Sequence, residues 1–98
     1  MSAFTEVLLE EGYLSTNELF RGWALLTALS RVDQYRAESE RYEEKYGLSL
    51  RAFEQSLRTE NEPEDFQKEE DLDDWLFAVE ALKWWEAKVE ELQLAASS

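Results

Sequence analysis

Apolar residues recur at intervals of three and four along most of this chain, and few residues interrupt the pattern. Only three glycines and one proline occur among 98 residues, which favours helices over strands. A short helix is predicted over residues 3–11, with Phe4, Val7 and Leu8 on one face. Gly12 follows at the position where a glycine commonly ends a helix.

A long helix is predicted over residues 16–46, and its start has the clearest signals in the chain. Ser15 fits the capping position, and Glu18 stands three residues further on, so that the two form a capping box. Leu14 and Leu19 occupy the two positions of a hydrophobic staple around that cap.

The two halves of this long helix differ in their apolar pattern. In the first half, apolar residues point in nearly every direction, which is typical of a helix that is buried or forms half of an interface. They are Leu19, Phe20, Trp23, Leu25, Leu26 and Leu29. In the second half, a narrow stripe indicates a seam between paired helices. Its members are Val32, Tyr35, Ser39, Tyr42 and Tyr46.

The small size of the chain adds an expectation about its assembly. A chain of this length buries only a small core, and a helix that is apolar all round needs more cover than that core supplies. We therefore expect a dimer. Its predicted seam contains Leu19, Trp23, Leu26, Tyr35 and Tyr42.

A second short helix is predicted after the long one. Gly47 is placed to end the long helix, and Ser49 is placed to cap the next. Leu50, Phe53 and Leu57 give this short helix its apolar face.

The last helix is predicted to begin near Asp71 or Asp73 and to run to about Leu94. Pro63 disfavours helix at the residue before it, so acidic residues 60–70 are expected to form a flexible linker. The predicted inner stripe comprises Leu72, Trp75, Val79, Leu82, Val89 and Leu92, with Trp85 at one margin.

These elements define an all-α protein with a single helical domain over residues 1–98. The predicted architecture is a small helical bundle with one long helix, two short helices and a C-terminal helix.

Composition removes several kinds of chemistry. The sequence contains neither cysteine nor histidine, so it lacks a thiolate nucleophile, the usual general base and the commonest zinc ligands. We expect no enzyme activity, no cofactor and no metal. No apolar run is long enough to span a bilayer, so a cytoplasmic protein is expected. The net charge of −13 argues against binding nucleic acid or anionic membranes, because both would be repelled.

The acidic charge is concentrated in one stretch, "ENEPEDFQKEEDLDD" at residues 60–74, which carries nine acids and one lysine. Asp71, Asp73 and Asp74 are oxygen ligands of the kind that calcium prefers, but the glycine and the distal glutamate of a calcium loop are absent. Acids at the start of a helix are the simpler interpretation, because they complement the helix dipole.

An enzymatic alternative depends on two pairs of carboxylates. Glu40 and Glu43 form an E-x-x-E, and Glu70 and Asp73 form an E-x-x-D. This spacing is similar to that of the all-α nucleotide pyrophosphohydrolases, which hold magnesium on a triphosphate. With 23 acids in the chain, such matches arise easily by chance.

The last helix also presents aromatic residues away from its predicted inner stripe. Phe77, Ala81 and Trp84 are placed on the opposite side, and Lys88 lies one turn further. One interpretation is that a short helix of the same chain covers them. The other is an interface, because tryptophan is common at binding hot spots.

Two segments of the chain resemble a known class of protein. The runs "RVDQYRAESERYEEKYGLSLRAFEQSL" and "EEDLDDWLFAVEALKWWEAKVEEL" are similar to small acidic antitoxins of prokaryotic type II toxin–antitoxin pairs. The likeness covers about residues 30–92 and is most specific at residues 69–86. It implies a protein that neutralises a basic toxin. The chain lacks the basic recognition helix with which many antitoxins bind DNA, so direct binding of nucleic acid is not expected.

The sequence therefore predicts a non-enzymatic acidic protein that binds a basic, toxin-like or nuclease partner. Its alternatives are a magnesium-dependent nucleotide hydrolase and a self-assembling structural protein. The predicted partner-binding residues are Glu64, Asp65, Glu69, Glu70, Asp71, Asp73, Asp74, Phe77, Trp84 and Lys88.

Overall fold

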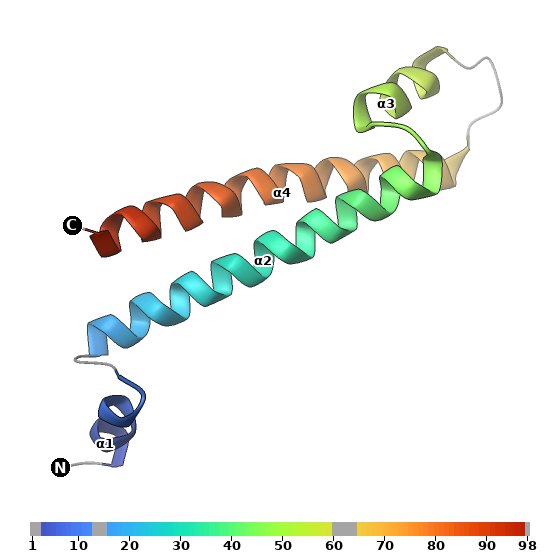
Figure 1. Cartoon of the computed structure of the whole chain (residues 1–98). Helices are drawn as coiled ribbons and strands as arrows, with labels where there is room; N and C mark the ends of the chain where they lie inside the picture. Colours follow the sequence, from blue (N-terminus) through green and yellow to red (C-terminus); the bar gives the residue numbers. More distant parts are fainter. Residues whose placement is uncertain (1–2, 13–15, 60–64, 98) are drawn as a thin grey trace.

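The computed structural model of the chain describes residues 3–12, 16–59 and 65–97. Four helices occupy nearly all of these residues, and no strand occurs among them, which confirms the all-α prediction (Figure 1). The helices are α1 (Ala3–Glu10), α2 (Thr16–Tyr46), α3 (Leu50–Thr59) and α4 (Phe66–Ser97).

The two long helices, α2 and α4, lie side by side and run in opposite directions (Figure 1). α3 packs beside α4 at one end of this pair, and α1 lies off the opposite end, where α2 begins. The chain measures 70 × 27 × 17 Å. It is therefore an elongated helical hairpin with two short helices, and it does not show the compact bundle that the sequence predicts.

The ends of α2 and α3 follow the predicted signals. Gly47 adopts a φ of 64°, and its N–H donates to the carbonyl of Glu43 at 2.8 Å, which closes the last turn of α2. The hydroxyl of Ser49 accepts the N–H of Ala52 at 3.2 Å, as expected for the cap of α3. Gly12, with a φ of 88°, follows α1. The capping box at Ser15 lies outside the described residues, as does Leu14 of the predicted staple.

The start of α4 differs from the sequence prediction. The carboxylate of Asp65 accepts the N–H groups of Gln67 at 3.1 Å and Lys68 at 3.3 Å, so Asp65 is the N-cap. α4 therefore begins at Phe66, upstream of the predicted start near Asp71 or Asp73, and residues 66–70 belong to a helix instead of a linker. Acids in the first turns favour this helix because they face its positive end. Residues 60–64 lie outside the described part.

The seam between α2 and α4 has the alternating spacing of four and three residues that is typical of coiled coils. In α2 it follows Ala28, Val32, Tyr35, Ser39, Tyr42 and Tyr46; in α4 it follows Asp71, Trp75, Ala78, Leu82, Trp85, Val89 and Leu92. The tyrosine stripe thus pairs helices as predicted, but α2 pairs with α4 of the same chain. In α4 the buried face is rotated from the predicted stripe, because Ala78 is fully buried whereas Leu72 and Val79 are only half-buried.

An aromatic cluster forms the core at the end of the hairpin near α3. The Trp75 side chain has an exposed fraction of 0%, and its ring stacks on Tyr42 with a centroid distance of 5.8 Å. Phe53 of α3 lies 5.6 Å from Trp75 and 4.1 Å from Tyr46, measured between ring centroids. The indole N–H of Trp75 donates to the hydroxyl of Ser39 at 3.1 Å. Trp75 therefore ties three helices together.

Trp75→Ala is expected to destabilise the chain strongly, because it removes a fully buried indole from the contact of three helices. The free energy of unfolding should fall by about 3–5 kcal/mol, as is typical of truncating a large aromatic core residue. Urea denaturation followed by circular dichroism measures the change. Leu76→Ala is the matched control, since Leu76 is the next residue and is partly exposed; an equal loss in both variants would contradict this account of the core.

Candidate partner-binding surface

Three large aromatic side chains of α4 are exposed to solvent, with exposed fractions of 73% for Phe66, 63% for Phe77 and 54% for Trp84. Phe77 and Trp84 are the two that the sequence predicts to bind a partner. Glu70, Asp74 and Lys88 lie at helical intervals from them, so that all five residues share one side of α4. We call these five residues the α4 face. Exposed aromatic residues aligned on one helix face are typical of an interaction surface.

Contacts within the chain hold both aromatic side chains of the α4 face in place. The ring of Phe77 meets Tyr35 of α2 edge-on, with the centroids 5.9 Å apart. The ring of Trp84 meets Trp85 edge-on at 4.9 Å, and the Lys88 ammonium lies 5.0 Å from the Trp84 centroid. The prediction that these residues lie opposite the seam is therefore wrong, because they flank it. Their exposure shows that neither of the described short helices, α1 and α3, covers them.

The predicted acidic residues fall into separate groups. Glu69, Glu70, Asp73 and Asp74 are exposed on the first turns of α4. Asp65 is exposed but caps the helix, and Glu64 lies outside the described residues. Asp71 is buried, and its carboxylate is engaged within the chain. Glu70 and Asp74 therefore belong to the α4 face. Asp65 and Asp71 instead stabilise the fold, Asp65 as a helix cap and Asp71 through its hydrogen bonds.

Asp71 is the centre of a polar cluster between α2 and α4. Its Oδ2 accepts hydrogen bonds from Lys45 Nζ at 2.6 Å and from the hydroxyl of Tyr46, and its Oδ1 accepts one from Gln67 Nε2 at 3.0 Å. Burial would raise the pKa of Asp71, but the hydrogen bonds from Lys45, Tyr46 and Gln67 outweigh it and hold that pKa below its usual value. The hydrogen bond to Asp71 raises the pKa of Lys45. Burial, aided by the same carboxylate, raises the pKa of Tyr46.

These pKa directions give the stability of the chain a defined dependence on pH. A carboxyl with a lowered folded-state pKa contributes stability above its unfolded value of about 3.9, and that contribution is lost as the pH falls through the folded value. Lys45 and Tyr46 have raised pKa values, so their contribution to stability is present below about pH 10 and is lost as the pH rises further. The cluster should therefore stabilise the fold throughout the neutral range.

Asp71→Asn is expected to lower the thermal midpoint at pH 7, because Lys45 and Tyr46 lose a charged acceptor. The difference from wild type should shrink below about pH 4, where the wild-type carboxyl becomes protonated. Thermal melts at several pH values, followed by circular dichroism, measure both effects. Asp74→Asn removes an exposed acid three residues away and is the control. A difference between Asp71→Asn and wild type that persists unchanged into strong acid would contradict the assignment.

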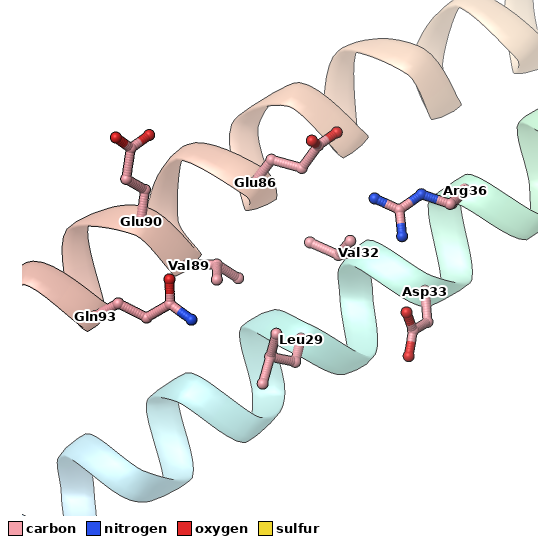
Figure 2. A pocket seen from close by; sticks show the side chains of 8 residues that line it. All are labelled: Leu29, Val32, Asp33, Arg36, Glu86, Val89, Glu90 and Gln93. Carbon is pink, nitrogen blue, oxygen red and sulfur yellow. The ribbon is translucent and has the colours of Figure 1, made fainter.

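Two grooves flank the seam towards the end of the hairpin near α1. The first encloses about 320 Å³ and has Leu29, Val32 and Val89 at its apolar part. Figure 2 shows Arg36 of α2 and Glu86 of α4 extending towards each other across this groove. Asp33, Glu90 and Gln93 complete its lining. Three acids and one arginine line this groove, so its charge is net negative and disfavours an acidic ligand.

The second groove encloses about 470 Å³ and is mostly apolar. Small residues of α2 leave room here beside two indole rings. It is lined by Trp23, Ala24, Thr27, Ala28, Trp85, Lys88, Glu91, Leu92 and Ala95. Lys88 lines this groove and also lies against Trp84, so the groove adjoins the α4 face. The apolar spacing did not indicate this groove, because its space comes from the small residues between the larger ones.

The residues of the predicted dimer seam lie in different environments. Tyr35 and Tyr42 contact α4 of the same chain. Leu19 is half-buried, while Trp23 and Leu26 each have an exposed fraction of 65%. The structure therefore leaves only the part of the seam in the first half of α2 open to another molecule.

The carboxylates of the enzymatic alternative do not come together. Within residues 3–12, 16–59 and 65–97, no group of three or more histidine, cysteine, aspartate or glutamate side chains is arranged to hold a metal ion. Glu40, Glu43, Glu70 and Asp73 are exposed and belong to no common ligand set.

No helix in the described ranges combines the length and the hydrophobicity needed to cross a membrane. Comparison with known proteins finds no match for this chain among protein families, curated proteins or solved structures.

Proposed function

We propose that this protein is a non-enzymatic acidic binding protein that neutralises a basic partner in the cytoplasm. The α4 face is the contact surface. The observation that carries this proposal is the exposure of Phe77 and Trp84 on the same side of one helix as Glu70 and Asp74. A basic toxin or nuclease is the partner that this surface fits best, in agreement with the resemblance of the sequence to acidic antitoxins.

Charge supplies the first part of the proposed mechanism. A protein that cleaves RNA attracts phosphates and is usually basic around its active site. The chain carries a net charge of −13 and presents exposed acids on the first turns of α4. Complementary charge accelerates the encounter of two proteins. A bound acidic helix would also exclude RNA from the covered site, because like charges repel.

Apolar burial supplies the second part. Phe77 and Trp84 are seven residues apart, which places them two turns, or about 10 Å, apart along the helix. Their contacts with Tyr35 and Trp85 restrain both rings before a partner arrives, which reduces the entropy lost on binding. Exposed ion pairs contribute little each to affinity, so the two rings are the proposed anchors.

Affinity purification of the full chain from its source cells tests the proposal directly. We expect a basic protein to be retained, and adding the purified chain to it should inhibit its cleavage of RNA with saturation near equal molar amounts. Retention of a protein that cleaves no RNA, or cleavage unaffected by the chain, would contradict a neutralising function. Magnesium-dependent nucleoside triphosphate cleavage that is lost in Glu40→Gln with Glu43→Gln would instead favour the hydrolase.

The kinetics of binding to that partner should separate the two kinds of contact. Glu70→Gln combined with Asp74→Asn should slow association and reduce its salt dependence, with little change in dissociation. Trp84→Ala should accelerate dissociation, with a loss of about 2–4 kcal/mol in binding free energy. Surface plasmon resonance at several salt concentrations measures both rates.

Leu94→Ala is the matched control for Trp84→Ala, because Leu94 is an exposed apolar residue on a different side of α4. Circular dichroism checks that each variant keeps its helices. Equal effects of the two substitutions on dissociation would show that the α4 face is not the contact surface.

A further inference from the structure

The first half of α2 carries an apolar surface that stays exposed to solvent in the part of the chain that the structure describes. Phe20 is 60% exposed, and Trp23 and Leu26 are 65% exposed. Together with the half-buried Leu19, these residues form what we call the α2 face. Soluble monomers seldom expose so many large apolar side chains within two turns of one helix.

The charge around the α2 face is unlike that of the rest of the chain. Residues 19–32, between Glu18 and Asp33, are the longest stretch of the sequence without an acid, although the chain has 23 acids. The only charged residues in this stretch are Arg21 and Arg31. A basic partner therefore finds no complementary charge on the α2 face, which separates this surface from the α4 face.

The charges at the two ends of this stretch permit association with an identical chain. Glu18 and Arg21 lie at one end, and Arg31 and Asp33 lie at the other, so that each end carries one charge of each sign. Two copies of α2 that cross in opposite directions bring these neutral ends together without placing like net charges against each other. Elsewhere the strongly negative surfaces of two copies repel.

The shape of the α2 face is also suited to a second copy. A hollow of about 310 Å³ is lined by Leu19, Phe20 and Trp23, and the groove of about 470 Å³ begins at Trp23. Leu26 projects into solvent one turn beyond. Hollows and projecting side chains thus occur on the same face, which is what a two-fold interface requires, because each copy supplies both to the other.

We propose that the α2 face binds a second copy of this chain and forms a two-fold dimer. Leu26 lies next to the middle of residues 19–32, so Leu26 of one copy lies close to Leu26 of the other. The open residues of the predicted seam, namely Leu19, Trp23 and Leu26, belong to this interface, whereas Tyr35 and Tyr42 serve the hairpin. The exposed acids of the α4 face lie towards the other end of a 70-Å molecule and stay accessible.

Sedimentation velocity over a concentration series tests the dimer. Wild type should sediment at twice the 11.5-kDa mass of the chain. Leu26→Glu should weaken the dimer by at least about 100-fold, because burial leaves two like charges without partners. Phe66→Glu makes the same change at a residue that is 73% exposed at the far end of α4, and it should leave the dimer intact.

A charge-reversal pair distinguishes self-association from a general loss of structure. Leu26→Lys alone should also be monomeric, and an equal mixture with Leu26→Glu should recover the dimer mass as a mixed species. Wild type that stays monomeric at all concentrations overturns the proposal, and this is the result expected if α1 covers the α2 face. A dimer that resists Leu26→Glu but dissociates in Phe66→Glu also overturns it. These outcomes are independent of partner binding through the α4 face.

Discussion

The packing of Trp75 is the contact on which the rest of the structure depends. Its ring lies against Tyr42 of α2 and Phe53 of α3, and its indole N–H reaches Ser39. One side chain of α4 therefore fixes how the three helices meet. The buried carboxylate of Asp71, one turn before it, accepts bonds from α2 and sets the same register by polar contacts. This end of the hairpin therefore combines buried aromatic rings with a buried carboxylate, both of whose oxygens accept hydrogen bonds.

Burial is unevenly distributed along the hairpin. Among the described residues, the buried apolar side chains are Ala28, Val32, Phe53, Trp75 and Ala78. The larger ones gather near α3, where three helices meet, and only two helices form the other end. Among the described residues no third helix packs against the pair there, so grooves open on both sides of the seam, and Phe20, Trp23 and Leu26 of α2 are exposed. The uneven core and the exposed surfaces are thus two results of the same architecture.

Helix positions could be predicted well wherever local chemistry decides them. Gly47 and Ser49 mark boundaries that depend on backbone conformation and on one hydrogen bond, and both appear in the structure as expected. The start of α4 could not be read in the same way, because the acids that suggested an extended linker also stabilise a helix N-terminus. The sequence groups Asp65 with the partner-binding acids, whereas in the structure it is the N-cap of α4.

The spacing of apolar residues also does not determine which helix packs against each apolar stripe. A stripe through Tyr35 and Tyr42 could pair with α2 of a second copy or with α4 of the same chain. Only the fold decides between these two partners. Asp71 was grouped with the exposed acids because a sequence does not show that Lys45 and Tyr46 lie opposite it. The helical spacing also predicts that Phe77 lies away from the inner stripe. It does not show that the ring lies beside the seam, in contact with Tyr35.

The four tryptophans of the chain occupy different surroundings, and this gives the protein built-in optical reporters. Trp75 is enclosed in the core, whereas Trp23 and Trp84 stand in solvent on separate faces. Indole emission shifts to longer wavelength in water, so we expect the intrinsic fluorescence to contain a blue component from Trp75 and a red component from the two exposed indoles. Replacing one exposed indole by phenylalanine would assign the red component to one face. Covering either surface would then be visible as a blue shift without any attached dye.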